Sequence, residues 1–254
     1  MPPKSPQAPV RRDGASANPL AEVPRWVWIV VAVVVAGAAA SFAVLRGSAA
    51  EKSGSGSGIA GVMKAAGCTY QDVAPNPPHV LRPQPNFHAD FPKLTTPIKA
   101  NEWSTDPPSA GGHYGQWAVW GFYTTAANPR QVVHNEEHGA VVIWWGPKVS
   151  AATVNQLHAF YNQSPDGMFG TPYPSLGDKI ALTAWTGDMA TYYRQVDVKV
   201  DGKTVKKTDY GMGHIAVCPK FDQKAFAAFR SAYVGKGPEG IPLKYNQAGM
   251  GPQS

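Results

Sequence analysis

Residues 133–145 read VHNEEHGAVVIWW, and they join a dense group of polar side chains directly to an apolar segment. The apolar part, residues 139–145, has the length and composition of a short buried strand. Pro147 follows two residues later and ends this run. The polar part carries His134, Glu136, Glu137 and His138 within five residues. We therefore expect a candidate site that lies directly beside a strand of the core sheet.

The other expected elements are short and of both kinds. Segments rich in β-branched and aromatic residues indicate strands, and Asp201-Gly202 predicts the turn of a hairpin over residues 192–208. Apolar residues recur at helical spacing after Ser150, which is a possible N-cap. This mixture indicates one compact α+β domain with a β-sheet and two main helices. The expected strands are 116–124, 139–145, 179–185 and 214–217, and the expected helices are 150–163 and 221–234.

An uncharged stretch of 20 residues, 26–45, reads WVWIVVAVVVAGAAASFAVL. A helix of this length spans about 30 Å, the thickness of a bilayer core. Basic residues precede it more densely than they follow it, so the positive-inside rule places the N-terminus in the cytoplasm. The sequence predicts a transmembrane helix over 26–46 and a single-pass protein of the cell membrane with an extracytoplasmic C-terminal domain. The alternative is a cleaved signal peptide, for which Ser48-Ala49-Ala50 would be the cleavage site.

Composition divides the chain around that segment. The composition predicts a disordered cytoplasmic tail at 1–25 and a Gly/Ser linker at 47–60. It predicts the extracytoplasmic α+β domain at 61–240 and a C-terminal tail at 241–254. The 23 Lys and Arg against 17 Asp and Glu give a net charge of +6 over 254 residues. This excess is spread too thinly to indicate a nucleic-acid partner. The sequence identifies no protein partner.

The two cysteines, Cys68 and Cys218, both lie on the exported side of the predicted membrane segment. Oxidising compartments favour a disulfide between such a pair. The alternative is a pair of free, buried thiols. The chain has no C-x-x-C motif, so a thiol-redox centre is not indicated.

Backbone geometry decides whether the polar run at 134–138 can bind one metal ion. On a helix or turn His134, Glu137 and His138 share a face, and the two histidines lie about 6 Å apart. On an extended strand the same histidines would be about 13 Å apart, too far for one ion. A metal site therefore requires a turn, a helix or a bulge here. His113, after Gly111-Gly112, is the candidate third histidine, and copper or zinc are the ions that these ligands suit.

Several alternatives remain open for this cluster. His113, His134 and His138 can instead form a structural hydrogen-bond network with Glu136 and Glu137. The string also matches H-x-x-E-H, an inverted zinc-peptidase motif, although that motif needs a helix and a β-rich run follows here at once. Met212 and His214 could offer soft ligands to copper, or simply form a turn.

The sequence also leaves several functions open. No separate nucleophile or acid/base pair is visible, so whether the protein is an enzyme is undecided. Metal handling or sensing is the leading hypothesis. The other two are a non-enzymatic interaction module of the cell envelope and a metal-dependent hydrolase or oxidase. An interaction module would use exposed aromatic side chains, for which the candidates are Trp103, Trp117, Trp120, Trp144 and Trp145.

Four motifs in order resemble the domain of unknown function 3105 family of bacterial proteins. They are the loop at 107–113 (PPSAGGH), the core at 134–139 (HNEEHG), the strand Thr183-Ala184-Trp185 and the closing Gly237-Pro238-Glu239. The resemblance covers about residues 68–240. It implies an extracytoplasmic domain that often follows an N-terminal anchor. It also selects Glu137 rather than Glu136 as the acid that accompanies His134 and His138.

Overall fold

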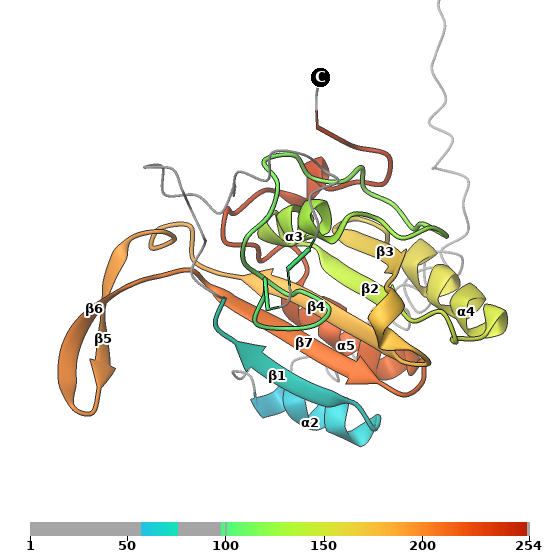
Figure 1. Cartoon of the computed structure of the whole chain (residues 1–254), viewed down its shortest axis with the longest axis horizontal. Coiled ribbons are helices and arrows are strands. Elements are labelled where there is room, and N and C mark those ends of the chain that lie inside the picture. The colour runs from blue at the N-terminus through green and yellow to red at the C-terminus, as the bar shows by residue number, and fades with distance from the viewer. Residues whose placement is uncertain (1–56, 76–97, 100, 253–254) are drawn as a thin grey trace, which may run out of the picture. The chain divides into compact units, whose positions relative to one another are not determined.

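The computed structural model describes residues 57–75, 98–99 and 101–252 (Figure 1). They belong to the second of the two units into which the chain divides, residues 53–254. The predicted tail at 1–25 and most of the linker at 47–60 lie outside the described residues. The elements are α2 Ser57–Ala65, β1 Thr69–Val73, α3 Pro129–Glu137, β2 Val141–Trp145, α4 Ala151–Asn162, β3 Met168–Pro172, β4 Ile180–Thr186, β5 Gln195–Val200, β6 Lys203–Thr208, β7 Met212–Cys218 and α5 Gln223–Tyr233, with short 3₁₀ turns at Pro174–Leu176 and Leu243–Tyr245.

Five strands form one mixed sheet in the order β1-β7-β4-β2-β3. All neighbouring pairs are antiparallel except β2 and β3, which are parallel. α4 connects these two parallel strands, as such a crossover requires. β2 and β4 lie in the interior of the sheet and are almost wholly buried, which agrees with their continuous apolar sequences.

The sheet is covered on both faces (Figure 1). On one face alternate residues such as Ile143 and Leu182 pack with Phe226 and Phe229 of α5, together with α2 and α4. On the other face Val142, Trp144 and Ala181 pack against Val132 of α3 and the loop around Trp120. Because α3 covers the second face, the candidate site lies between this helix and the loops around it.

The described residues thus form a mixed α+β fold, but the sequence-based account of it needs two corrections. The two expected helices are present as α4 and α5, but the described part of the chain adds two shorter ones, α2 and α3. The segment 116–124 is not a strand beyond an isolated bridge at Phe122. At this bridge Gly170 of β3 bonds to Gly121 and Tyr123, but Trp120 bonds elsewhere: its N–H donates to the Met250 carbonyl, and Gly249 N–H donates to its carbonyl. Pairing of this segment with the sheet is therefore confined to one residue of β3.

The expected fold class also included a membrane-spanning helix, and this is corrected for the part of the chain that the structure describes. Within residues 57–75, 98–99 and 101–252, no helix combines the length and the apolar character that crossing a bilayer needs. The α-helices found there contain 9, 9, 12 and 11 residues, whereas a bilayer core requires about 20. Residues 26–46 lie outside the described residues.

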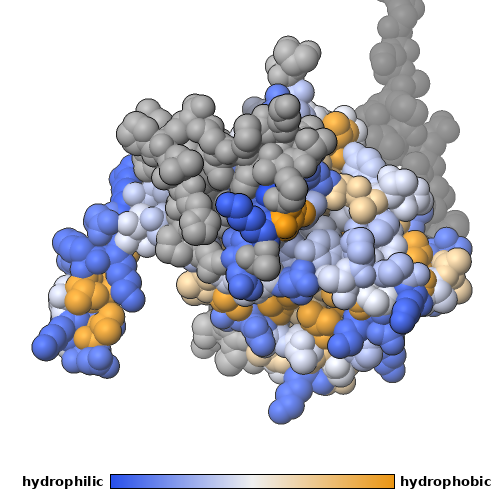
Figure 2. All heavy atoms as spheres, in the orientation of Figure 1, coloured by the Kyte–Doolittle hydropathy of each residue, from blue (hydrophilic) through white to orange (hydrophobic). Residues whose placement is uncertain are grey.

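The β5–β6 hairpin forms a sheet of its own. Its turn is at Asp201-Gly202, where both residues have positive φ, as the sequence predicts. Val198 faces Val205 across the pair, and Val200 and Val205 are exposed. Figure 2 shows the resulting hydrophobic patch on the hairpin among hydrophilic residues. The lysines of this segment are exposed, so the hairpin is solvated.

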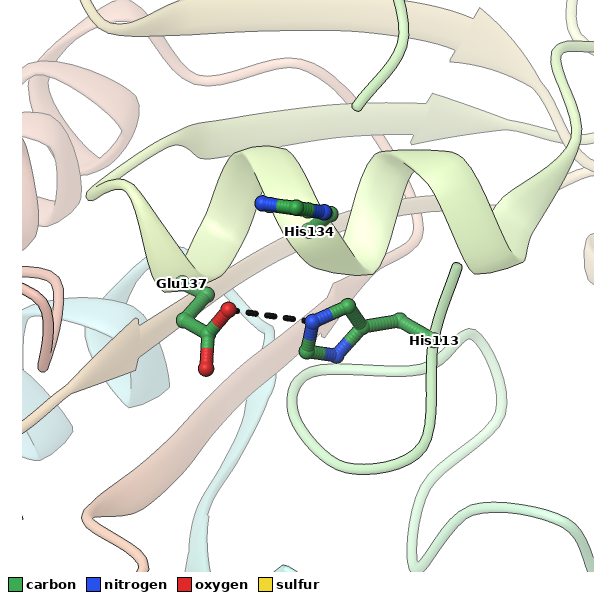
Figure 3. A group of neighbouring side chains, drawn as sticks. All are labelled: His113, His134 and Glu137. Atoms are coloured by element: carbon green, nitrogen blue, oxygen red, sulfur yellow. Dashed lines mark ion pairs between the residues drawn. The ribbon is translucent and has the colours of Figure 1, made fainter. Parts of the chain in front are cut away.

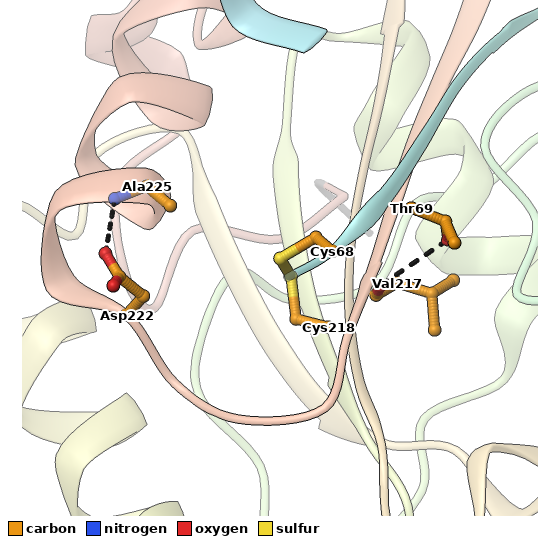
Figure 4. Close-up of a disulfide and its surroundings, with 6 residues drawn as sticks. All are labelled: Cys68, Thr69, Val217, Cys218, Asp222 and Ala225. Carbon is orange, nitrogen blue, oxygen red and sulfur yellow. Dashed lines mark hydrogen bonds between the residues drawn. A yellow bond between two sulfur atoms is a disulfide. The ribbon is translucent and has the colours of Figure 1, made fainter. Parts of the chain in front are cut away.

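A disulfide joins Cys68 to Cys218, with an S–S distance of 2.03 Å (Figure 4). Cys68 immediately precedes β1, and Cys218 ends β7, so the bond fastens the edge strand β1 to its neighbour. β1 itself reads TYQDV and is mostly exposed, so side-chain burial contributes little to its attachment. The bond closes a loop across 150 residues of sequence.

Reduction of this disulfide should destabilise the domain strongly. The chain-entropy treatment gives about 5 kcal/mol for a loop of this length, because the reduced unfolded chain gains conformational freedom. Urea unfolding of the protein with and without reductant measures the effect. The double variant Cys68→Ser/Cys218→Ser should match the reduced protein and should not respond to reductant. Equal midpoints for oxidised and reduced protein would contradict this expectation.

Candidate metal centre

α3 carries most of the candidate site, and its two ends explain why it is a helix. Asn128 is the N-cap and accepts a hydrogen bond from the Arg130 N–H, and Pro129 occupies the first turn. His138 is the C-cap, and Gly139 follows at φ 100°, a backbone conformation that favours glycine. The requirement for a turn, helix or bulge at 134–138 is therefore met by a helix.

The helix brings His134 and Glu137 together with His113 from the preceding loop. Figure 3 shows the His113 ring directed at Glu137, with His134 above them on α3. His113 Nε2 lies 3.0 Å from Glu137 Oε2, and both side chains are buried. One ligand atom from each of the three residues falls within 4.8 Å of the others.

A second group of ligand atoms shares His134 with the first. The Nε2 atoms of His134 and His138, one helical turn apart, are separated by 3.0 Å. His138 Nε2 lies 3.2 Å from Glu239 Oε2. These three residues also have one ligand atom each within 4.8 Å of one another. Trp117 covers this group, with its ring centre 4.8 Å from that of His138.

Hydrogen bonds to carbonyls orient two of the rings. His113 Nδ1 lies 2.8 Å from the Gly111 carbonyl oxygen, and His134 Nδ1 lies 2.7 Å from that of Tyr114. A carbonyl oxygen only accepts, so both Nδ1 atoms carry the proton and donate it. Each Nε2 atom is then directed into the cluster. Such a carbonyl partner fixes the tautomer and the orientation of metal-binding histidines.

Burial controls the charges in the site. Desolvation lowers the pKa of His134 to about 2, and the neighbouring His113 adds to the effect, so this imidazole is neutral. Burial opposes ionisation of Glu137, but the adjacent His113 more than offsets it and brings the pKa of this carboxyl below its usual value. The Tyr192 hydroxyl donates to Glu137 Oε1 at 2.5 Å. Glu137 is thus a buried carboxylate with a partner on each oxygen.

The residues between these ligands hold the helix in place. Asn135 accepts from the Ala118 N–H and donates to the Ala118 carbonyl, both at 2.9 Å. Glu136 accepts a hydrogen bond from the Thr183 hydroxyl on β4, and burial raises its pKa well above the usual value. Glu136 is therefore a neutral side chain directed at the sheet, away from the two ligand groups.

Close backbone approach places Glu239 in the cluster. A Cβ at Gly139 would lie 2.9 Å from the Gly235 Cα, and one at Gly237 would lie 2.2 Å from the Glu137 carbonyl oxygen. Gly235 N–H donates to the Gly139 carbonyl at 2.9 Å. These contacts press the segment 235–239 against the end of α3. Asn246, also buried, donates to the His138 carbonyl at 2.8 Å.

The structure brings His113, His134, Glu137 and His138 into one region, but as two overlapping ligand groups. Glu239 joins them and was not expected as a ligand, although it ends the Gly237-Pro238-Glu239 motif that the family resemblance singled out. His214 lies outside both groups. Its Nδ1 is 2.6 Å from Asp72 Oδ1, and its Nε2 is 2.7 Å from the Thr186 hydroxyl, so it links three neighbouring strands.

The fold and this site define a small α+β domain with a buried histidine–carboxylate cluster. The family model described as "Protein of unknown function (DUF3105)" matches residues 96–242. The match covers more than half of the chain, and the chain belongs to this family. It includes every residue of both ligand groups. Searches of the curated proteins and of the solved structures found no match.

Removal of the Asn135 side chain should destabilise the site from outside the ligand groups. Asn135→Ala leaves the Ala118 N–H and carbonyl without their buried partner, and each such loss costs about 1–3 kcal/mol. We expect the free energy of unfolding to fall by about 2–4 kcal/mol in urea denaturation. Asn155→Ala on the exposed side of α4 is the matched control and should change it by less than about 0.5 kcal/mol. Equal effects of the two substitutions would contradict a stabilising role for the hydrogen bonds between Asn135 and Ala118.

Acid should weaken the metal-free fold in a defined window. The pKa of His134 is lowered in the folded protein, so below about pH 6.5 the unfolded chain binds a proton that the folded protein does not. The contribution of His134 to stability is then constant above about pH 6.5 and falls below it by about 1.4 kcal/mol per pH unit. His214, whose pKa burial also lowers, acts in the same direction, whereas Glu136, whose pKa burial raises, acts in the opposite direction above about pH 4.5. Urea unfolding between pH 5 and 7.5 measures the slope, and His134→Gln should reduce it; an unchanged slope in this variant would contradict the assignment.

Proposed function

We propose that this domain binds one transition-metal ion, copper or zinc, at the cluster of His113, His134, Glu137, His138 and Glu239. The supporting observation is that two sets of three ligand atoms each lie within 4.8 Å around one shared histidine. Imidazole nitrogen and carboxylate oxygen are the ligand types that these ions take.

The separations between ligand atoms suit a shared ion. Ligands about 2.1 Å from an ion in tetrahedral geometry lie about 3.4 Å from each other. The observed separations are 3.0 Å between the His134 and His138 nitrogens and 3.2 Å from His138 to Glu239. Small side-chain adjustments would therefore convert these contacts into coordination. The carbonyl partners of His113 and His134 would hold their rings during that change.

The contacts favour holding an ion over chemical turnover. A general base needs a carboxylate directed at a reacting water. Glu137 instead meets Tyr192 with one oxygen and His113 with the other. The role we propose is accordingly metal handling or sensing. The competing interpretation is a metal-free network, in which the pairs His113–Glu137 and His138–Glu239 only fix the loops to α3.

Metal loading separates these two interpretations. The full-length protein is incubated with excess zinc or copper and dialysed, and the bound metal is measured by elemental mass spectrometry. We expect about one ion per chain, because the two ligand sets share His134. The His134→Ala variant should bind little or none, since both sets lose their common ligand.

His158→Ala is the matched control, because His158 is exposed on α4 and stacks on Phe122 outside the cluster. It should keep the metal content of the unmodified chain. Near-zero metal in the unmodified protein, or equal metal with and without His134, would support the structural network. Near-ultraviolet circular dichroism shows whether each variant is folded.

A further inference from the structure

The two ligand groups differ in their access to solvent. In the inner set, defined here as His113, His134 and Glu137, the side chains of His113 and Glu137 are 0% and 1% exposed. In the outer set, His134, His138 and Glu239, the corresponding values for His138 and Glu239 are 9% and 33%. An ion arriving from solvent therefore meets the outer set first. Glu239 is its most exposed ligand and carries the charge that attracts a cation.

His134 cannot serve both sets at once. Its Nδ1 donates to the Tyr114 carbonyl at 2.7 Å, so Nε2 is the only nitrogen that can bind an ion. One lone pair coordinates one ion. The two sets are thus alternative positions for a single ion, with His134 Nε2 as the ligand common to both.

The inner set is the better place to hold an ion. Glu137 is fixed by the Tyr192 hydroxyl, and His113 is fixed by the Gly111 carbonyl, so little side-chain freedom is lost on binding. Attraction between a cation and a carboxylate is also stronger where water is excluded. Glu239, by contrast, is partly in water.

We propose that the ion is taken up at the outer set and held at the inner set, with His134 coordinating it throughout the transfer. This inference rests on the proposed metal binding and adds to it a direction of movement. Exchange of a ligand pair around a retained histidine needs no release of the ion to solvent. The domain would then acquire and release its ion through Glu239 and His138.

Two tryptophans lie beside the cluster and can report on copper. The Trp117 ring centre lies 4.8 Å from that of His138 in the outer set and 5.5 Å from that of the shared His134, whereas the Trp185 ring centre lies 5.9 Å from that of His113 in the inner set. Cu²⁺ quenches nearby indoles, so stopped-flow fluorescence of the full-length protein mixed with Cu²⁺ follows both events. We expect a fast phase that depends on copper concentration and a slower phase that does not.

Three variants assign these phases. Trp117→Phe should reduce the fast amplitude more than the slow one, because Trp117 lies closer to His138 than to the shared His134. Glu239→Gln should slow both copper uptake and its release into excess chelator by about tenfold or more, the scale expected when a metal-positioning group is lost. Glu137→Gln should keep the fast phase, lose the slow one and accelerate release. Asp178→Asn, which removes an exposed acid elsewhere, is the charge control and should alter neither phase.

A single phase with full copper uptake would overturn the two positions while leaving metal binding intact. Equal uptake rates in the Glu239→Gln and Asp178→Asn variants would do the same. Absence of copper from the dialysed unmodified protein would overturn the metal proposal itself, and this inference with it. Because Glu239 is partly exposed, its substitution leaves the buried contacts of α3 in place, and folding is checked by circular dichroism.

Discussion

The burial of α3 is the constraint on which the rest of the structure depends. The helix reads PRQVVHNEE, and its last six residues are all buried, four of them polar. A buried polar group without a partner costs more free energy than most packing contacts supply. Each polar side chain of this helix therefore needs its own partner from another segment. Those partners are the loops, the sheet and the C-terminal region that enclose the candidate site.

The partners are of two kinds, and the kind of partner distinguishes the residues that hold the fold from those that form the candidate site. Asn135 is satisfied by backbone groups of Ala118, and Glu136 by a hydroxyl on β4. The Thr183 hydroxyl in turn accepts a hydrogen bond from the Trp144 indole at 2.6 Å. This series of hydrogen bonds therefore ends inside the core. His134, Glu137 and His138 instead meet other titratable side chains. Neighbouring residues of one helix thus serve the fold and the site.

Part of this arrangement could be predicted from sequence. The strands around residues 139–145, 179–185 and 214–217 carry their own apolar patterns, and all three lie in the interior of the sheet, where local sequence and burial agree. The pair His134 and His138 could be recognised as candidate ligands, because residues four apart lie close together on a helix or turn and far apart on a strand. α3 itself was not predicted as a helix, because a helix buried on every side has no amphipathic pattern. Its remaining signal was Asn128-Pro129, a cap followed by a first-turn proline.

What could not be predicted depends on contacts between distant segments. Residues 116–124 have strand composition, yet they pair with β3 only at Gly170, and their other partners are Asn135 and the segment around Met250. β1 is polar and exposed, and pairing with β7 beside the disulfide holds it. Glu239 reaches His138 across about a hundred residues because Gly139 and Gly237 have no side chains to keep their backbones apart. Nothing in the local sequence of Glu239 reports that approach.

The charges of the cluster add a last argument for a cation. Glu136 is neutral because burial raises its pKa, and His134 is neutral because burial lowers its own. Glu137 is ionised, and Glu239 is the second carboxylate of the cluster. Arg130, the nearest buried cation on α3, is bound to Glu102 through two nitrogens at 2.5 and 2.7 Å, so its charge is already compensated. Two carboxylates around the neutral His134 nitrogen are an environment that a divalent cation neutralises, and the partly exposed Glu239 is the side from which it would arrive.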